Sequence, residues 1–167
     1  MLYIYIHLTT LIISSIIAVH GLNPRSKNNV DHAWDTWRTP AGPQGRLWLR
    51  DDLPQSIPES RIFLYEYNST AAYGKNRDTF IDEANELLEQ ISMERDGVEP
   101  RPIVFLGHSM GGLLIKQALI TYTNRNSWPI INATAGLAFF ATPHYCGDGI
   151  LVSLGGQAAK IAIALGF

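Results

Sequence analysis

A serine between two glycines has the setting of a catalytic nucleophile. The residues Gly107-His108-Ser109-Met110-Gly111 fit the pattern G-x-S-x-G. An apolar run, 102–106, precedes the pattern and an apolar helical stretch follows it at once, which is the strand-to-helix turn that such a serine requires. Gly107 and Gly111 allow a strained turn because they lack side chains that would clash. We therefore predict that Ser109 is a nucleophile; the alternative is an ordinary serine in a glycine-rich turn.

A second glycine turn, His20-Gly21-Leu22, follows the first apolar run of the chain. A serine nucleophile needs an oxyanion hole, with one backbone N–H from the residue after the serine and another from a His-Gly-type loop. On this pattern, Met110 and Leu22 supply the two N–H groups. We expect His20 to order the loop that carries Leu22 rather than to act as a base.

The serine also needs a base within hydrogen-bond reach and an acid that orients the base. After Ser109 the sequence has one histidine, His144, and one acidic residue, Asp148. Their order is the reverse of the usual order of serine, acid and histidine for this motif. His108 is adjacent to the serine but is expected to face away from its hydroxyl. Two interpretations stay open for His144: a catalytic base, or a structural residue that lines the pocket.

Four apolar runs that alternate with helical patterns would position these residues. The expected strands are 11–19, 61–67, 102–107 and 135–140, and the expected helices are 77–95, 110–123 and 150–165. This alternation predicts a three-layer α/β fold, with a parallel sheet and helices on both faces. In such a sheet, sites lie at the carboxyl ends of the strands, where Gly21, Ser109 and His144 fall.

The first 19 residues carry no charge and are rich in Ile and Leu. β-Branched residues dominate 11–19, which favours a strand buried on both faces. The apolar stretch is just long enough for a membrane helix, so a membrane or targeting segment is the alternative. No element is predicted for 1–10.

The segment 23–45 contains three prolines and two glycines and is predicted to be mostly loop. Trp34 and Trp37 either pin this loop to the body of the domain or face a ligand. Residues 47–53 are predicted to form a short helix that Pro54 stops.

Composition argues against several other functions. The net charge is −2 and the 13 basic residues are scattered, which is unlike a nucleic-acid-binding protein. Cys146 is the only cysteine, so no internal disulfide and no cysteine-based metal cluster can form. A phosphate-binding loop is also excluded, because Leu113 and Leu114 occupy the positions where that motif needs Lys and then Ser or Thr. We predict no metal and no cofactor.

Several segments together resemble the serine active-site-containing protein family of lipase/esterase-like α/β-hydrolases, which also occur as amino-terminal modules of fungal multidomain proteins. The matching segments are 19–22, 48–51, 53–54, 61–62 with Tyr65, 101–113, 116–119 and 139–144. The resemblance runs from about residue 17 to 149. It implies hydrolysis of a small-molecule ester or lipid without a metal. It also implies association with mitochondrial or endoplasmic-reticulum membranes; a cytoplasmic location is the alternative.

In that family the acid and the base lie on later strands, whereas this sequence stops at Phe167. We therefore expect a single partial α/β-hydrolase domain over 1–167, with a recognisable core at 11–149 and a sheet truncated after the fourth strand. The helix within 150–167 is either a lid remnant or a packed helix. The chain is then a weak or inactive serine hydrolase, or a non-catalytic binding module whose open sheet edges favour a larger protein or an oligomer.

Overall fold

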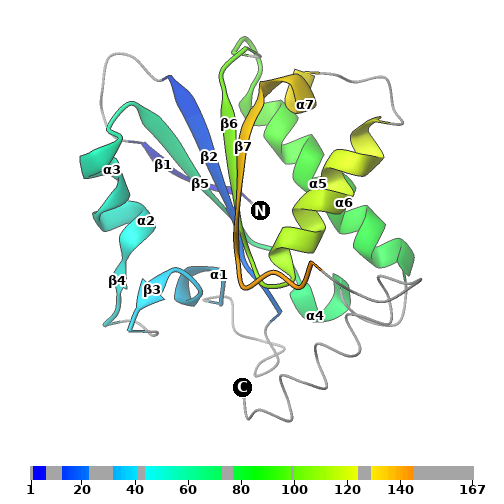
Figure 1. Ribbon diagram of the computed structural model, residues 1–167, viewed down its shortest axis with the longest axis horizontal. Helices are drawn as coiled ribbons and strands as arrows, with labels where there is room; N and C mark the ends of the chain where they lie inside the picture. Colours follow the sequence, from blue (N-terminus) through cyan, green and yellow to red (C-terminus); the bar gives the residue numbers. More distant parts are fainter. Residues whose placement is uncertain are drawn as a thin grey trace.

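Five strands form the main sheet in the computed structural model, which describes residues 2–6, 13–22, 32–40, 44–72, 77–98, 100–123 and 129–144 (Figure 1). The bounds are Leu2–Ile6 for β1, Ser14–Val19 for β2, Ser60–Tyr65 for β5, Ile103–His108 for β6 and Thr134–Phe140 for β7. Their order across the sheet is β1-β5-β2-β6-β7. β2, β5, β6 and β7 are parallel, and β1 is antiparallel to β5. The predicted α/β fold is confirmed.

β1 is a strand that the sequence pattern did not predict. It lies within 1–10 and pairs with β5 along its whole length. The strand predicted at 11–19 is confirmed over Ser14–Val19 as β2, and residues 11–12 lie outside the described residues. β2 lies between β5 and β6, with Ile17, Ala18 and Val19 almost fully buried. In the part of the chain that the structure describes, no helix has both the length and the apolar composition needed to cross a membrane.

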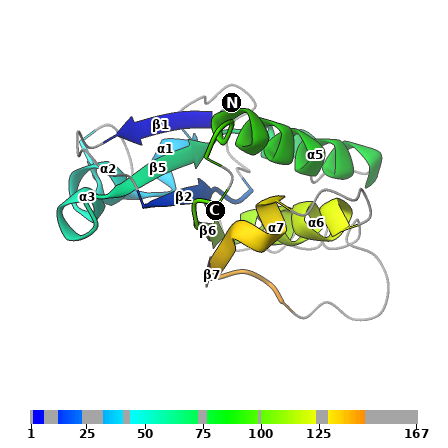
Figure 2. The same ribbon diagram turned by 90° about the horizontal axis from the view of Figure 1, so that it is seen from above.

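Helices α4 to α7 pack on one face of the sheet, where α5, α6 and α7 are seen in Figure 2. Their bounds are Ser69–Ala72, Arg77–Glu94, Gly111–Thr123 and Pro129–Ala133. Phe80 and Leu87 of α5 and Leu114 of α6 join Phe105 of β6 in one buried core. Burial of each such side chain contributes about 1.5–3 kcal/mol to folding. The core therefore holds α6, and with it the turn at its start, firmly against β6.

Short elements between β2 and β5 cover the opposite face (Figure 2). They are α1 (His32–Asp35), β3 (Arg38–Thr39), β4 (Arg46–Leu47), α2 (Trp48–Asp51) and α3 (Leu53–Ser56). The single helix predicted over 47–53 is wrong, because two helices meet at Asp52. Pro54 lies in the first turn of the second helix rather than stopping the first, since a first-turn residue needs no backbone N–H. The loop predicted over 23–45 also contains α1 and β3.

The carboxyl ends of the parallel strands meet at one end of the sheet, the lower end in Figure 1. The register shows this directly, because Val19 of β2 pairs with Gly107 of β6, and His108 pairs with Phe140 of β7. Ligand sites of parallel sheets lie at this end. The helix predicted over 150–165 lies outside the described residues.

Candidate active site at the carboxyl ends of β2, β6 and β7

Ser109 turns the chain from β6 into α6. Its backbone φ is 51°, a left-handed conformation that residues with a side chain rarely adopt. Such a conformation costs about 1–3 kcal/mol and persists only where the surroundings enforce it. One enforcing contact is a 2.7 Å hydrogen bond from the Ser109 N–H to the carbonyl oxygen of Phe140. The half-buried serine is thus held by the neighbouring strand β7.

Three glycines let β6, α6 and their neighbours approach closely around this turn. A Cβ on Gly107 would lie 2.6 Å from the Cα of Gly112, a separation that real Cβ atoms do not show. A Cβ on Gly111 would overlap the carbonyl oxygen of His20, and one on Gly112 would overlap the side chain of Thr142. Gly107 and Gly111 were singled out from the motif, whereas the need for Gly112 comes only from packing.

Gly21 brings the end of β2 into contact with the serine. A Cβ on Gly21 would lie 2.8 Å from the Cβ of Ser109 and 3.0 Å from the carbonyl oxygen of His108. The second of these neighbours is backbone and cannot rotate away. The structure therefore places the predicted oxyanion loop directly against the predicted nucleophile, and it does so only because residue 21 has no side chain.

His20 is buried and holds this loop in place. The Tyr67 N–H donates to its Nε2 at 3.4 Å, so Nδ1 carries the proton and donates to the Gly21 carbonyl at 2.8 Å. The Tyr67 ring stacks on the imidazole at 4.4 Å, and its hydroxyl donates to the His20 carbonyl at 3.0 Å. Both ring nitrogens of His20 are bound to backbone groups, which fits the loop-ordering role expected from the sequence. Tyr67 is a partner that sequence analysis missed.

The two predicted oxyanion donors follow the serine and the glycine that contacts it, Ser109 and Gly21. Met110 directly follows the serine, is buried, and precedes the 13-residue helix α6. The N-terminus of a helix carries partial positive charge and favours an anion. Leu22 follows Gly21, and its half-buried side chain packs against the core on the face covered by α4 to α7. The role of these two backbone N–H groups stays a prediction.

His108 packs against an aromatic cluster formed by Trp37, Trp48 and Phe140. The centroid of its ring lies 6.3 Å from that of Trp37, edge to face, and Trp37 lies 6.0 Å from Phe140 and 5.9 Å from Trp48. Burial lowers the pKa of His108, so the imidazole is neutral at pH 7. Among the described residues, neither its Nδ1 nor the Nε1 of Trp37 has a hydrogen-bond partner. Trp37 is 3% exposed, which supports the interpretation that it pins its loop to the domain.

His144 is bound to α6 and not to Ser109. Its Nδ1 accepts a 2.7 Å hydrogen bond from Nζ of Lys116, and its ring lies edge-on to Phe139 at 5.0 Å. No histidine in the described ranges is hydrogen-bonded to the Ser109 hydroxyl. These contacts favour the structural interpretation of His144. Asp148 lies outside the described residues.

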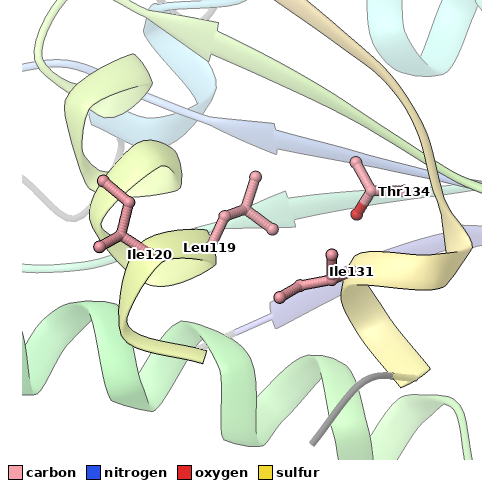
Figure 3. Close-up of a pocket in the computed structure, with 4 residues that line it drawn as sticks. All are labelled: Leu119, Ile120, Ile131 and Thr134. Atoms are coloured by element: carbon pink, nitrogen blue, oxygen red, sulfur yellow. The ribbon is translucent and has the colours of Figure 1, made fainter. Parts of the chain in front are cut away.

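A shallow apolar pocket lies at the opposite end of the sheet (Figure 3). Its volume is about 400 Å³, and it is lined by Leu119, Ile120, Ile131 and Thr134. Thr134 pairs with Ile103 at the start of β6, so the pocket is remote from Ser109. The Thr134 hydroxyl donates to the Ile130 carbonyl at 2.7 Å. No three His, Cys, Asp or Glu side chains within the described ranges gather closely enough to hold a metal.

Comparison with known proteins places the chain near one group of relatives. No protein-family model matches it. It is 29% identical to the protein SERAC1 of Bos taurus over 151 residues, which cover 79% of the chain. SERAC1 of Homo sapiens is 28% identical over the same share, and that of Mus musculus is 32% identical over 59% of the chain. The chain spans about a fifth of the length of these curated relatives, 22% for the first two and 16% for the third.

Proposed function

We propose that this chain is a serine hydrolase-like domain of the lipase/esterase-like α/β-hydrolase family, with Ser109 as nucleophile and a small-molecule ester or lipid as substrate. The observation that carries the proposal is the left-handed backbone of Ser109 at the turn from β6 into α6. A strained residue of this kind, at the end of a buried strand, is typical of a nucleophile elbow. Similarity to SERAC1 over most of the chain supports the family assignment.

The arrangement of β2, β6 and α6 suits acyl transfer. Ser109 Oγ would attack the carbonyl carbon of an ester, and the N–H groups of Met110 and Leu22 would bind the oxyanion that forms. The positive end of α6 would stabilise the same charge. One oxyanion donor of this type is worth about 2.7–4 kcal/mol of transition-state stabilisation. Collapse of the intermediate would release the alcohol, and water would then hydrolyse the acyl-serine.

The base and the acid of the reaction are proposed to come from outside the described residues. His20 is occupied by Tyr67 and Gly21, and His144 is held by Lys116. An oxyanion hole and substrate binding without the triad retain roughly 10³–10⁴-fold catalysis over water in related enzymes. We therefore expect weak turnover unless a base from outside these residues reaches Ser109.

A non-catalytic binding module is the second candidate. It is favoured by one observation, that none of the described histidines contacts the serine hydroxyl. In that case the turn, the glycines and the ordered loop would be an inherited scaffold, and Ser109 would be no more reactive than a surface serine.

A fluorophosphonate probe, which reacts with activated serines, distinguishes the two candidates. The hydrolase proposal predicts labelling of the wild-type chain, loss of labelling in Ser109→Ala, and full labelling in Ser92→Ala, a control at an exposed serine of α5. Labelling should persist in His144→Ala, because His144 is bound elsewhere. A folded wild-type chain that resists the probe would support the binding module instead, and loss of labelling in His144→Ala would make His144 the base.

Membrane association enters the proposal through the family resemblance alone. Deleting 1–19 is not a usable test, because it would remove the buried strand β2. Alkaline carbonate extraction of cells that express the full chain is the direct measurement. Recovery in the membrane pellet would support an integral anchor, and full release into the supernatant would contradict it.

A further inference from the structure

The peptide between Gly21 and Leu22 carries a buried hydrogen-bond acceptor on one side and a proposed oxyanion donor on the other. Its carbonyl oxygen accepts a 2.8 Å hydrogen bond from Nδ1 of His20. This peptide is trans and planar, so its C=O and its N–H point in opposite directions. The hydrogen bond from His20 therefore sets the direction of the Leu22 N–H, which points away from the imidazole.

Glycine at position 21 makes such a hydrogen bond necessary. A Cβ there would lie 2.8 Å from the Cβ of Ser109, so the close contact with the serine requires glycine. Glycine also has the widest range of backbone conformations of any residue, so the peptide that follows it can rotate unless another group holds it. The contact with Ser109 thus depends on Gly21, whereas the direction of the Leu22 N–H depends on His20.

Tyr67 determines which nitrogen of His20 carries the proton. Its backbone N–H donates to Nε2 of His20 at 3.4 Å, which places the proton of the neutral ring on Nδ1. In the other tautomer, two N–H groups would face each other at Nε2, and Nδ1 would present a lone pair to the Gly21 carbonyl oxygen. Both hydrogen bonds would then be lost. Only the tautomer that Tyr67 selects can hold the Gly21–Leu22 peptide.

The preceding peptide, between His20 and Gly21, is fixed by two further contacts. The Tyr67 hydroxyl donates to the His20 carbonyl oxygen at 3.0 Å. The same oxygen lies so close to Gly111 that a Cβ on that glycine would overlap it. The loop therefore packs against the first residue of α6, which directly follows Met110, the other proposed oxyanion donor.

We propose that Tyr67 and His20 are positioning residues that aim the Leu22 N–H at the oxyanion. Tyr67 selects the Nδ1–H tautomer of His20, and this tautomer fixes the Gly21–Leu22 peptide. Neither side chain contacts the substrate in this scheme. The inference rests on the proposed function, because the oxyanion is that of the proposed ester hydrolysis. The tautomer and the direction of the Leu22 N–H are properties of the free chain and can be measured without any reaction.

NMR spectroscopy of the full wild-type chain tests the tautomer first. Long-range spectra that correlate the ring nitrogens of His20 with its carbon-bound protons are expected to show a neutral ring with the proton on Nδ1. A proton on Nε2 would overturn the proposal, because that tautomer cannot donate to the Gly21 carbonyl.

Residual dipolar couplings then measure the direction of the Leu22 N–H. The wild type is expected to give the coupling that the peptide orientation in the structure requires. His20→Asn should preserve this coupling, because the side-chain nitrogen of Asn is bonded to Cγ, as Nδ1 of His is, and also donates. His20→Gln should change it, because Gln keeps an acceptor for Tyr67 but has no donor at the position of Nδ1. An unchanged coupling in a folded His20→Gln variant would overturn the proposal.

The rate of fluorophosphonate labelling measures the consequence for the oxyanion. Loss of one oxyanion donor slows catalysis about 10²–10³-fold, and we expect a fall of this size in His20→Gln but not in His20→Asn. Tyr67→Phe removes only the hydroxyl and should slow labelling about 2- to 10-fold. Tyr65→Phe is the matched control, since the buried Tyr65 hydroxyl donates to the Glu83 carbonyl of α5, and this variant should react at the wild-type rate.

The two measurements separate failure of this inference from failure of the proposed function. A reactive wild type together with wild-type labelling of His20→Gln would overturn the positioning role and leave the hydrolase function standing. A folded wild type that resists the probe would contradict the hydrolase function, and the dipolar couplings would still decide whether His20 orients the Leu22 N–H. Circular dichroism shows whether each variant is folded.

Discussion

The N–H of Ser109 donates a 2.7 Å hydrogen bond to the carbonyl oxygen of Phe140, so the last residue of β7 holds the backbone of the predicted nucleophile. The ring of Phe140 packs against Trp37, and Trp37 packs against His108, which precedes the serine. A strand and a loop segment from distant parts of the chain therefore support the same turn.

Gly21→Ala should weaken both folding and reactivity. The added Cβ would lie 2.8 Å from the Cβ of Ser109 and 3.0 Å from a backbone oxygen, so the loop or the turn must move. We expect a loss of about 1–3 kcal/mol in the free energy of unfolding, as for other overpacked sites, and loss of fluorophosphonate labelling. Gly136→Ala is the control, because its Cβ would find no atom closer than 3.7 Å. Equal stability of the two variants in urea titration would show that the loop does not contact Ser109.

Ser109→Gly should be more stable than Ser109→Ala. Both variants lack the hydroxyl, but only glycine adopts a φ of 51° without strain. Relief of roughly 1–2 kcal/mol is partly offset by the greater flexibility of glycine in the unfolded chain. We expect a net gain of about 0.5–1 kcal/mol for Ser109→Gly over Ser109→Ala. If thermal and urea unfolding rank Ser109→Ala first, the turn is not left-handed in solution.

His108→Phe should flatten the dependence of stability on pH below neutrality. Burial lowers the pKa of His108, so between that value and about 6.5 the unfolded chain binds a proton that the native chain does not. Wild-type stability must therefore rise as pH increases through this range, and part of the rise should vanish in the variant. Urea titrations at several values between pH 5 and 8 measure the two slopes. Identical slopes would mean that His108 is not buried in a neutral form.

The parallel strands could be predicted because each one coincides with its own apolar run, and the motif residues at their ends identify the candidate site. β1 could not be predicted in this way. Its residues, Leu2–Ile6, form a strand through pairing with β5, a segment far along the chain. The helices on the opposite face are also too short, at four residues each, to show a helical period.

The supporting groups around Ser109 were beyond sequence reasoning for a different reason. The Phe140 carbonyl and the Tyr67 N–H are backbone groups, which every residue possesses and no motif marks. The double glycine at 111–112 offered a signal, since a second glycine after G-x-S-x-G is not needed by the motif. The close packing of Gly112 against Thr142, Phe139 and Gly107 explains it.

Trp37→Phe and Trp37→Ala should separate ring packing from the indole N–H. Trp37 is 3% exposed and contacts His108, Phe140 and Trp48, so Trp37→Ala should lower the free energy of unfolding by about 3–5 kcal/mol. Trp37→Phe retains an aromatic ring and removes a buried N–H that has no partner among the described residues. An unpaired buried donor costs about 1–3 kcal/mol, which offsets part of the lost packing. We therefore expect Trp37→Phe to lose much less stability than Trp37→Ala and to retain fluorophosphonate labelling at Ser109. A Trp37→Phe variant as unstable as Trp37→Ala would show that the indole N–H has a partner in solution.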